Sequence, residues 1–375
     1  MTTGDTQSGT LVDPHSAPRV MVVDFNGLGS ACLAVPVFKA LERAHPGIAY
    51  SYPENALMAD PVIRKAGGID GLLALTPPLW RRFYRKDWQD LADFIDGHAI
   101  DTVVNFRNRD LAVDPAYAEF RTWFGQRGYS PTVSWHDLYG VAAVASLSGQ
   151  ERMRRVLAEA GLAPATPFEQ HWLRPLATAL AERRPVRPGR RVGLFCGAST
   201  FSKRWPAEHW AELVRRLAGD EDLVFEVFCG ATGEELDAAL DLVEQLGEVQ
   251  SPERMSVVPF GSLGDLLPRL LGLSVLVVGD TGIGHLAGSC RVPTVSLFLS
   301  TDPGAWAPAS ELTVTPRGRI GEVCPHQRPL QGNCTYYYDG CDAPCRWDLL
   351  PRRVAGAVHD ALARGAHGSF LRERS

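Results

Sequence analysis

The sequence has few lysines, no excess of basic residues and no long hydrophobic run. Only four of its 375 residues are lysine, and the formal net charge of −5 argues against the basic surface that nucleic-acid binding needs. The longest mostly apolar stretch, residues 270–278, has about half of the ~20 residues of a membrane-spanning helix. The first 18 residues lack the hydrophobic segment of a secretion signal. We therefore expect a cytoplasmic protein without a membrane span or a nucleic-acid partner, and peripheral contact with a membrane stays open.

The pattern of apolar segments predicts two α/β domains. A length of 375 residues corresponds to two domains at ~150 residues each. In both halves, short apolar segments alternate with helical ones, which is typical of parallel sheets covered by helices on both faces. We expect two Rossmann-like, doubly wound domains that face each other across a cleft. The predicted boundaries are 1–18 for a flexible N-terminus, 19–175 for the first domain, 176–190 for a linker, 191–350 for the second domain, and 351–375 for a C-terminal helix that packs back on the first domain.

Two glycine-rich turns have part of the pattern of a dinucleotide-binding site. Residues 27–32 follow a predicted strand and open a helix, but Cys32 stands where the third glycine belongs. Residues 282–287 are separated from their strand by Asp280 and Thr281, whereas the strand of a Rossmann turn leads directly into the glycines. A match of this kind is weak on its own. We keep an NAD-dependent oxidoreductase as an alternative that rests on these motifs alone.

The segment from Asp280 to His285 has the features of an anion site. A buried strand precedes Asp280 and Thr281, and open α/β sheets bind ligands at the carboxyl ends of their strands. The glycines that follow let the backbone approach a ligand, and a helix that begins near His285 directs its positive dipole end there. His285 can donate to a phosphate oxygen, and Asp280 can accept from sugar hydroxyls. The structural alternative is that Asp280 only caps the helix and His285 lies on the surface.

A second loop, residues 197–206, carries further polar groups. Ser199 and Thr200 are short hydroxyl side chains among small residues, and Lys203 is the only lysine in the second half. The loop precedes a helix with Pro206 in its first turn. Lys203 either binds a phosphate as a point charge or is an ordinary solvated charge.

Together these segments resemble the ADP-heptose heptosyltransferases of glycosyltransferase family 9, which have the GT-B architecture of two Rossmann-like domains. The resemblance extends over about residues 19–365. Its matching pieces are Gly27-Leu-Gly29 with Pro36, Gly197-Ala-Ser199 with Lys203-Arg-Trp205-Pro206, Gly230-Ala-Thr-Gly-Glu234, Asp280-Thr-Gly with His285-Leu-Ala, and Val292-Pro-Thr-Val-Ser-Leu-Phe298 followed by Thr301-Asp-Pro303.

The resemblance implies an inverting glycosyltransferase with ADP-heptose as the donor. The second domain would hold the donor, and the first would hold an acceptor that is a glycan, a specialised metabolite or a protein. In this family a helix N-terminus and basic side chains replace a divalent cation, so no catalytic metal is expected. The donor-binding residues that the resemblance implies are Ser199, Thr200, Lys203, Gly230, Asp280, Thr281, Gly282 and His285.

The chain departs from the family at its first glycine loop. The family has an aspartate after the glycine, which deprotonates the acceptor hydroxyl, and this chain has Ser30. A serine is a poor base without a partner that takes its proton. Either the base has moved within the first half, or the acceptor needs less activation, or the protein binds a nucleotide-sugar without catalysis. The candidates for a relocated base are Asp24, Asp110, His136 and Asp137.

Four cysteines lie close together near the C-terminus. Cys324, Cys334, Cys341 and Cys345 fall within 22 residues of a segment that has little apolar material for a core. Four thiolates can enclose Zn²⁺ or iron tetrahedrally, although the spacing lacks paired C-x2-C motifs. Some members of the family have a cysteine-rich tail here, including protein heptosyltransferases with a bound iron, and this segment is similar. We expect a structural metal, with free thiols and disulfides as the alternatives.

Overall fold

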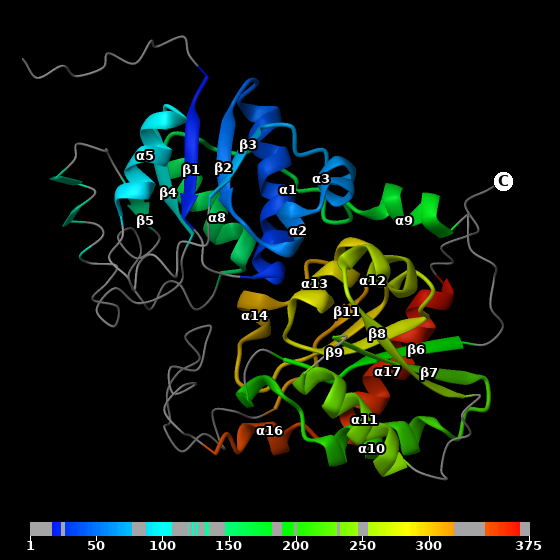
Figure 1. The fold of residues 1–375 in the computed structure, drawn as a ribbon. Coiled ribbons are helices and arrows are strands. Elements are labelled where there is room, and N and C mark those ends of the chain that lie inside the picture. The colour runs from blue at the N-terminus through cyan, green and yellow to red at the C-terminus, as the bar shows by residue number, and fades with distance from the viewer. Residues whose placement is uncertain are drawn as a thin grey trace, which may run out of the picture.

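The computed structural model describes residues 17–23, 27–76, 88–106, 119, 122–123, 125–126, 132–134, 147–181, 190–198, 201–230, 233–246, 254–318 and 342–367. They form two α/β domains, each built around a parallel sheet (Figure 1). The predicted fold class is therefore confirmed. None of the helices among the described residues combines the length and the hydrophobicity that a bilayer span requires.

The sheet of the first domain has, among the described residues, the strand order β3-β2-β1-β4-β5, and all neighbours are parallel. The last four residues of β1 are buried, because helices cover both faces of the sheet. The strands are β1 (Arg19–Val23), β2 (Ala49–Pro53), β3 (Leu72–Thr76), β4 (Thr102–Asn105) and β5 (Thr132–Ser134). The helices are α1 (Leu28–Ala44), α2 (Ala56–Ala59), α3 (Pro61–Gly67), α5 (Gln89–Gly97), α8 (Gly149–Glu159) and α9 (Arg174–Ala181).

The sheet of the second domain has the order β11-β10-β9-β6-β7-β8 over the same described part of the chain, again with parallel neighbours. Its strands are β6 (Arg190–Phe195), β7 (Leu223–Gly230), β8 (Met255–Phe260), β9 (Val275–Gly279), β10 (Thr294–Leu297) and β11 (Thr313–Val314). Its helices are η2 (Phe201–Lys203), α10 (Ala207–Leu217), α11 (Glu234–Leu246), α12 (Leu263–Leu270), α13 (Gly282–Ser289), α14 (Pro303–Trp306), α16 (Cys345–Asp348) and α17 (Pro351–His367).

The C-terminal helix α17 packs on the second domain. Its apolar residues Val354 and Val358 are fully buried in the same core as Val277 of β9 and Val295 of β10 (Figure 1). The prediction that this helix packs back on the first domain is therefore wrong for residues 351–367. The physical reason is that the apolar stripe of α17 covers one face of the second sheet, which would otherwise be exposed.

The two domains meet through α1 and α13, which lie next to each other in Figure 1 and share one hydrophobic core. Apolar residues of both helices are buried there, among them Leu33 of α1 and Leu286 of α13. The segment before α9 joins the same contact, because the Leu173 amide donates to the Ser289 carbonyl oxygen at 3.2 Å. The carboxyl end of β9, which leads into α13, therefore lies close to the first domain.

Candidate functional site

Asp280 lies at the centre of a buried cluster of polar side chains. It follows Gly279, the last residue of the fully buried strand β9, so the strand places its carboxylate at the carboxyl edge of the sheet. Its Oδ2 atom is 2.7 Å from the Lys203 Nζ atom and accepts a 2.8 Å hydrogen bond from the Thr301 hydroxyl. One carboxylate oxygen thus has both a cation and a hydroxyl as partners.

Lys203 reaches Asp280 because its backbone lies against Gly279, the residue before Asp280. It is the last residue of η2, whose buried Ser202 accepts a 3.1 Å hydrogen bond from the Ser300 hydroxyl. A Cβ atom at Gly279 would lie 3.3 Å from the Lys203 carbonyl oxygen, so a larger residue there would hinder this approach. The structure therefore brings two predicted ligand contacts, Lys203 and Asp280, together as an ion pair.

His285 lies in the first turn of α13, and only 6% of it is exposed. Burial lowers the pKa of its imidazole to about 4; the nearby Asp280 carboxylate opposes this effect and the Lys203 ammonium adds to it. The side chain is therefore neutral at pH 7 and can donate one ring N–H to a ligand. Its Nδ1 atom has no hydrogen-bond partner among the described residues.

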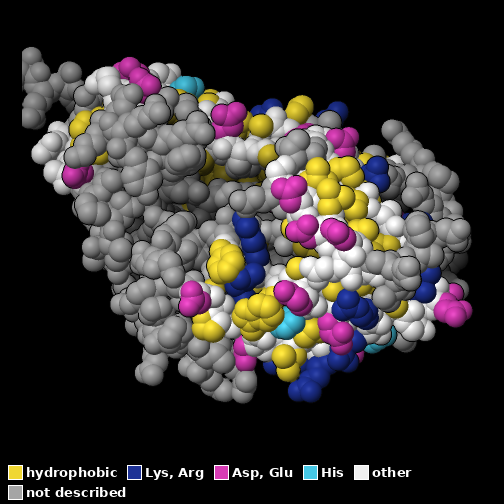
Figure 2. All heavy atoms as spheres, turned by 60° about the horizontal axis from the view of Figure 1, so that its bottom comes forward, with side chains coloured by type: hydrophobic (Ala, Val, Ile, Leu, Met, Phe, Trp, Pro, Cys, Tyr) yellow, Lys and Arg dark blue, Asp and Glu magenta, His cyan; other side chains and the backbone are white. Residues whose placement is uncertain are grey.

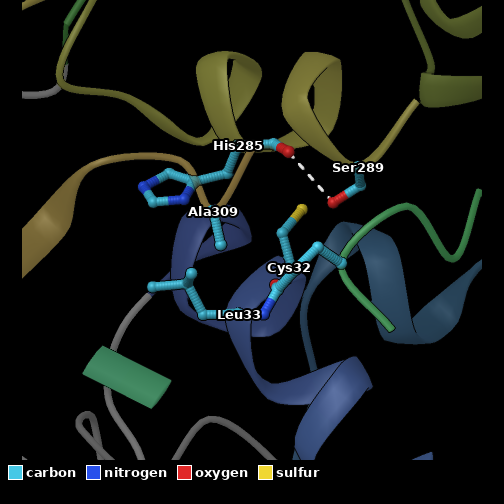
Figure 3. A pocket seen from close by; sticks show the side chains of 6 residues that line it. Cys32, Leu33, His285, Ser289 and Ala309 are labelled. Carbon is cyan, nitrogen blue, oxygen red and sulfur yellow. Dashed lines mark hydrogen bonds between the residues drawn. The ribbon is translucent and has the colours of Figure 1, made fainter. Parts of the chain in front are cut away.

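A small pocket lies between α1 and α13 next to His285 (Figure 3). Its volume of about 10 Å³ accommodates a water-sized molecule and no nucleotide-sugar. The Ser289 hydroxyl donates to the His285 carbonyl oxygen at 3.0 Å, so it is already bonded within its own helix. The residues that line the pocket are Cys32, Leu33, Gln170, His285, Ser289 and Ala309.

The N-terminus of α13 has the character of an anion site. Thr281 is the N-cap residue, but its side chain makes no capping hydrogen bond, and its hydroxyl oxygen is buried without a partner among the described residues. The first turn of α13 contains no acidic residue. The unpaired N–H groups and the positive dipole end of the helix favour a negatively charged ligand at this point.

The first turn of α1 covers one side of this N-terminus. A Cβ atom at Gly29 would lie 2.9 Å from the His285 Cδ2 atom, and one at Gly282 would lie 2.6 Å from the Leu28 Cβ atom. Both distances are too short for real carbon contacts, so the close approach of the two domains requires glycine at both positions. Gly282, predicted to contact a ligand, thus also has a packing role.

The ends of β6 and β7 adjoin the same edge of the sheet and are connected by Glu235. The Gly230 amide donates to the Glu235 Oε2 atom at 3.0 Å, and a Cβ atom at Gly197 would lie 2.9 Å from the Glu235 side chain. A carboxylate at this position can accept hydrogen bonds from ribose hydroxyls. The sequence indicated Gly230 but not Glu235, because the matching segment ends at Glu234.

Three further residues of the cluster were missed by sequence reasoning. Thr301 belongs to the Thr301-Asp-Pro303 segment of the resemblance, which assigned it no role. Ser202 and Ser300 lie in separate loops, so only the fold shows that their hydroxyls meet.

The remaining predicted residues fall into two groups. Ser30 is buried in the first turn of α1, and Cys345 is buried at the start of α16. Among the described residues, no group of three or more potential metal ligands is found. The others lie outside the described residues: Asp24, Asp110, His136, Asp137, Ser199, Thr200, Cys324, Cys334 and Cys341.

Exposed aromatic side chains lie near the cluster, on the surface formed by η2 and α16. Phe201 and Trp347 are about half exposed, and the guanidinium carbon of Arg346 lies 3.8 Å from the centroid of the Phe201 ring. Figure 2 shows hydrophobic and basic side chains next to each other at a hollow on this side of the molecule. Arg346 already covers one face of the Phe201 ring, and exposed aromatic rings such as Phe201 and Trp347 can stack on a ring system.

The sequence has clear relatives among known proteins. Residues 148–327 match the family model described as glycosyltransferase family 9 (heptosyltransferase). Lipopolysaccharide heptosyltransferase 1 of Pseudomonas aeruginosa is 26% identical over 344 residues, which cover 85% of this chain and 88% of the relative.

Solved structures of two glycosyltransferases have a similar fold. The E. coli heptosyltransferase WaaC with ADP has a TM-score of 0.59 at 17% identity, over 92% of this chain and 99% of WaaC. The iron-containing dodecameric glycosyltransferase TibC of enterotoxigenic E. coli has a TM-score of 0.53 at 13% identity, over 95% of this chain and 78% of TibC. Its complex with ADP-D-β-D-heptose has also been solved. The chain is therefore a glycosyltransferase of GT-B architecture that resembles the heptosyltransferases of glycosyltransferase family 9.

Proposed function

We propose that the protein transfers heptose from ADP-heptose to an acceptor with inversion at the anomeric carbon. The observation that carries this proposal is the buried cluster of Asp280, Lys203 and Thr301 next to the uncapped N-terminus of α13. The cluster combines groups for a diphosphate with a carboxylate for sugar hydroxyls. ADP in the WaaC structure and ADP-heptose in the TibC complex support the choice of donor.

Each group of the cluster has a role in this reaction. Lys203 and the N–H groups of α13 would stabilise the negative charge that develops on the departing diphosphate. The neutral His285 would donate a hydrogen bond to it, and Asp280 would accept from a heptose hydroxyl. Ser199 and Thr200 would add phosphate contacts. Because a helix N-terminus and a lysine supply the positive charge, the proposal requires no catalytic metal.

The part of the proposal that concerns the acceptor must account for Ser30, which stands where the family has an aspartate as the catalytic base. We place the base elsewhere in the first domain, at Asp24, Asp110, His136 or Asp137, or assume an acceptor that needs less activation. If Asp110 or His136 is the base, the variant Asp110→Asn or His136→Ala that removes it should lower kcat by roughly 100-fold. Full turnover in both would exclude these two residues. The acceptor would be a glycan, a specialised metabolite or a protein.

A nucleotide-sugar-binding protein without catalysis is the second candidate, and Ser30 is the observation that favours it. Calorimetric titration with ADP, UDP, GDP, dTDP and NAD should show ADP as the tightest ligand, by roughly tenfold. Incubation with labelled ADP-heptose then separates the two candidates, because an enzyme releases ADP and a binding protein does not. Tighter binding of NAD than of ADP would contradict both.

We further propose a structural zinc or iron at the four C-terminal cysteines. Four thiols are a suitable donor set for either metal, and the related TibC structure is iron-containing. Metal analysis of protein purified without a histidine tag should find about one equivalent per chain, and substitution of Cys345 by serine should abolish it.

A cytoplasmic location agrees with the buried free thiols of Cys32, Cys229 and Cys290.

A further inference from the structure

The ion pair between Lys203 and Asp280 has a consequence for donor binding. Only 18% of the Lys203 side chain and 7% of the Asp280 side chain are exposed, so the two charges depend on each other for compensation. A diphosphate at the N-terminus of α13 would attract the same ammonium group. Lys203 cannot serve both anions fully, so Asp280 and the diphosphate compete for it.

Asp280 would be left with an uncompensated buried charge when Lys203 turns toward a diphosphate. Burying such a carboxylate costs free energy, so the Asp280 side chain would rotate toward the lysine or toward solvent. The Thr301 hydroxyl opposes this movement, because it donates to the same Oδ2 atom at 2.8 Å and is 3% exposed. Hydrogen bonds to charged groups are about twice as strong as neutral ones.

The position of Thr301 is itself fixed by its neighbour in the chain. Ser300 is fully buried and donates its hydroxyl to the Ser202 hydroxyl at 3.1 Å. This bond connects the segment after β10 to η2, the segment that carries Lys203. The two segments that supply the partners of Asp280 are therefore linked behind the site.

We infer that Thr301 is a positioning residue. It holds the Asp280 carboxylate in place while the Lys203 ammonium group turns from Asp280 to the donor diphosphate. Because the Thr301 hydroxyl donates to the Oδ2 atom of Asp280, the Oδ1 atom of the same carboxylate stays available to accept from a hydroxyl of the donor sugar. The inference deepens the proposed function and rests on it. It predicts that the loss of the Thr301 hydroxyl affects the sugar more than the nucleotide.

The kinetic test compares Thr301→Val with Thr301→Ser. The valine variant should lower kcat for ADP-heptose turnover by about 10-fold to 100-fold, while the dissociation constant for ADP changes less than about threefold. The serine variant keeps the hydroxyl and should retain kcat within about threefold. Thr294→Val is a matched control, because Thr294 is fully buried and donates to the Val292 carbonyl oxygen at 2.8 Å, away from Asp280. Equal losses of kcat in all three variants would overturn the inference.

A ligand-free test separates this inference from the proposed function. In the Lys203→Ala variant, which imitates the departure of the lysine, a crystal structure should show Asp280 in its present rotamer, bonded to Thr301. In the double variant Lys203→Ala/Thr301→Val, the carboxylate should leave this position. If Asp280 moves already in Lys203→Ala, the inference is wrong whatever the donor is. If instead the wild-type protein fails to bind ADP or to consume ADP-heptose, the proposed function is wrong, and the crystal structures still decide the role of Thr301.

Discussion

Two basic side chains, one in each domain, differ in how their charges are compensated. Lys203 of the second domain pairs with Asp280 at 2.7 Å. Arg152 of α8, in the first domain, is 6% exposed and donates its Nε–H to the Leu147 carbonyl oxygen at 3.0 Å, but neither Nη atom has a partner among the described residues. Its guanidinium lies 5.2 Å from the ring centroid of Trp306 in α14. The charge of Lys203 is thus compensated by a direct ion pair, whereas the Nη atoms of Arg152, at the contact between the domains, have no hydrogen-bond partner among the described residues.

Breaking the compensated pair should have the largest effect on stability. In Lys203→Met, Asp280 remains as a buried carboxylate without its cation, which should lower the free energy of unfolding by about 3 kcal/mol. The double variant Lys203→Met/Asp280→Asn removes both charges and should recover most of this loss. Urea denaturation of both variants and of Lys65→Met, an exposed lysine on α3, measures the difference. A double variant as unstable as the single one would show that packing, and not charge, is lost.

His285 makes the stability of the protein sensitive to acid. In the unfolded chain a histidine binds a proton near its ordinary pKa of 6.5, whereas in the folded protein burial lowers the pKa to about 4. The unfolded state therefore binds more protons between these values, and stability decreases as the pH falls from 6.5 to 4, by about 1.4 kcal/mol per pH unit. The His285→Gln variant should lose this part of the pH dependence. The exposed His359→Gln is the control, and an unchanged slope in His285→Gln would contradict the prediction.

The close approach of α1 and α13 can be tested with a single added carbon. In Gly29→Ala the new Cβ atom would lie 2.9 Å from the His285 Cδ2 atom, so the domains must shift or the histidine ring must turn. We expect a loss of about 1–2 kcal/mol. Gly356→Ala in α17 adds the same group in open space and should stabilise its helix by about 1 kcal/mol. If both variants are stabilised alike, the contact between α1 and α13 is looser than the structure indicates.

Much of the cluster around Asp280 could be predicted from the sequence. Asp280 and His285 follow an apolar strand and a glycine turn within one short segment, so local pattern and resemblance were enough to place them at the carboxyl edge of a sheet. Lys203 was indicated by its isolation among arginines. In contrast, Thr301 lies 21 residues from Asp280, and its role depends on β9 and β10 being neighbours.

Less of the contact between the two domains could be predicted from the sequence. Arg152 is one of many arginines, and only the fold shows that it is buried against Trp306 of the other domain. The prediction placed α17 on the wrong domain. The apolar stripe of the helix shows that it packs against a sheet, but it does not show against which of the two sheets. Gly29 was read as part of a ligand motif, whereas the structure places it against His285.

The smallest expected effect concerns Arg152 and has the opposite sign. Burial lowers the pKa of its guanidinium from 12.5 to about 10, with Asp302 opposing this effect, so the charged form is disfavoured in the folded protein. Replacement by Met, which is similarly long and carries no charge, should raise the free energy of unfolding by about 1 kcal/mol. Because the penalty exists only while Arg152 is protonated, the difference between wild type and Arg152→Met should shrink as the pH rises through about 10. Urea denaturation of both proteins at pH 8 and near pH 11 checks the sign. A variant that is less stable than wild type at pH 8 would mean that the contact of the guanidinium with Trp306 stabilises the protein more than the burial of its charge destabilises it. Lys203 and Arg152 would then differ in the kind of partner that stabilises their charge, and not in whether the charge is stabilised.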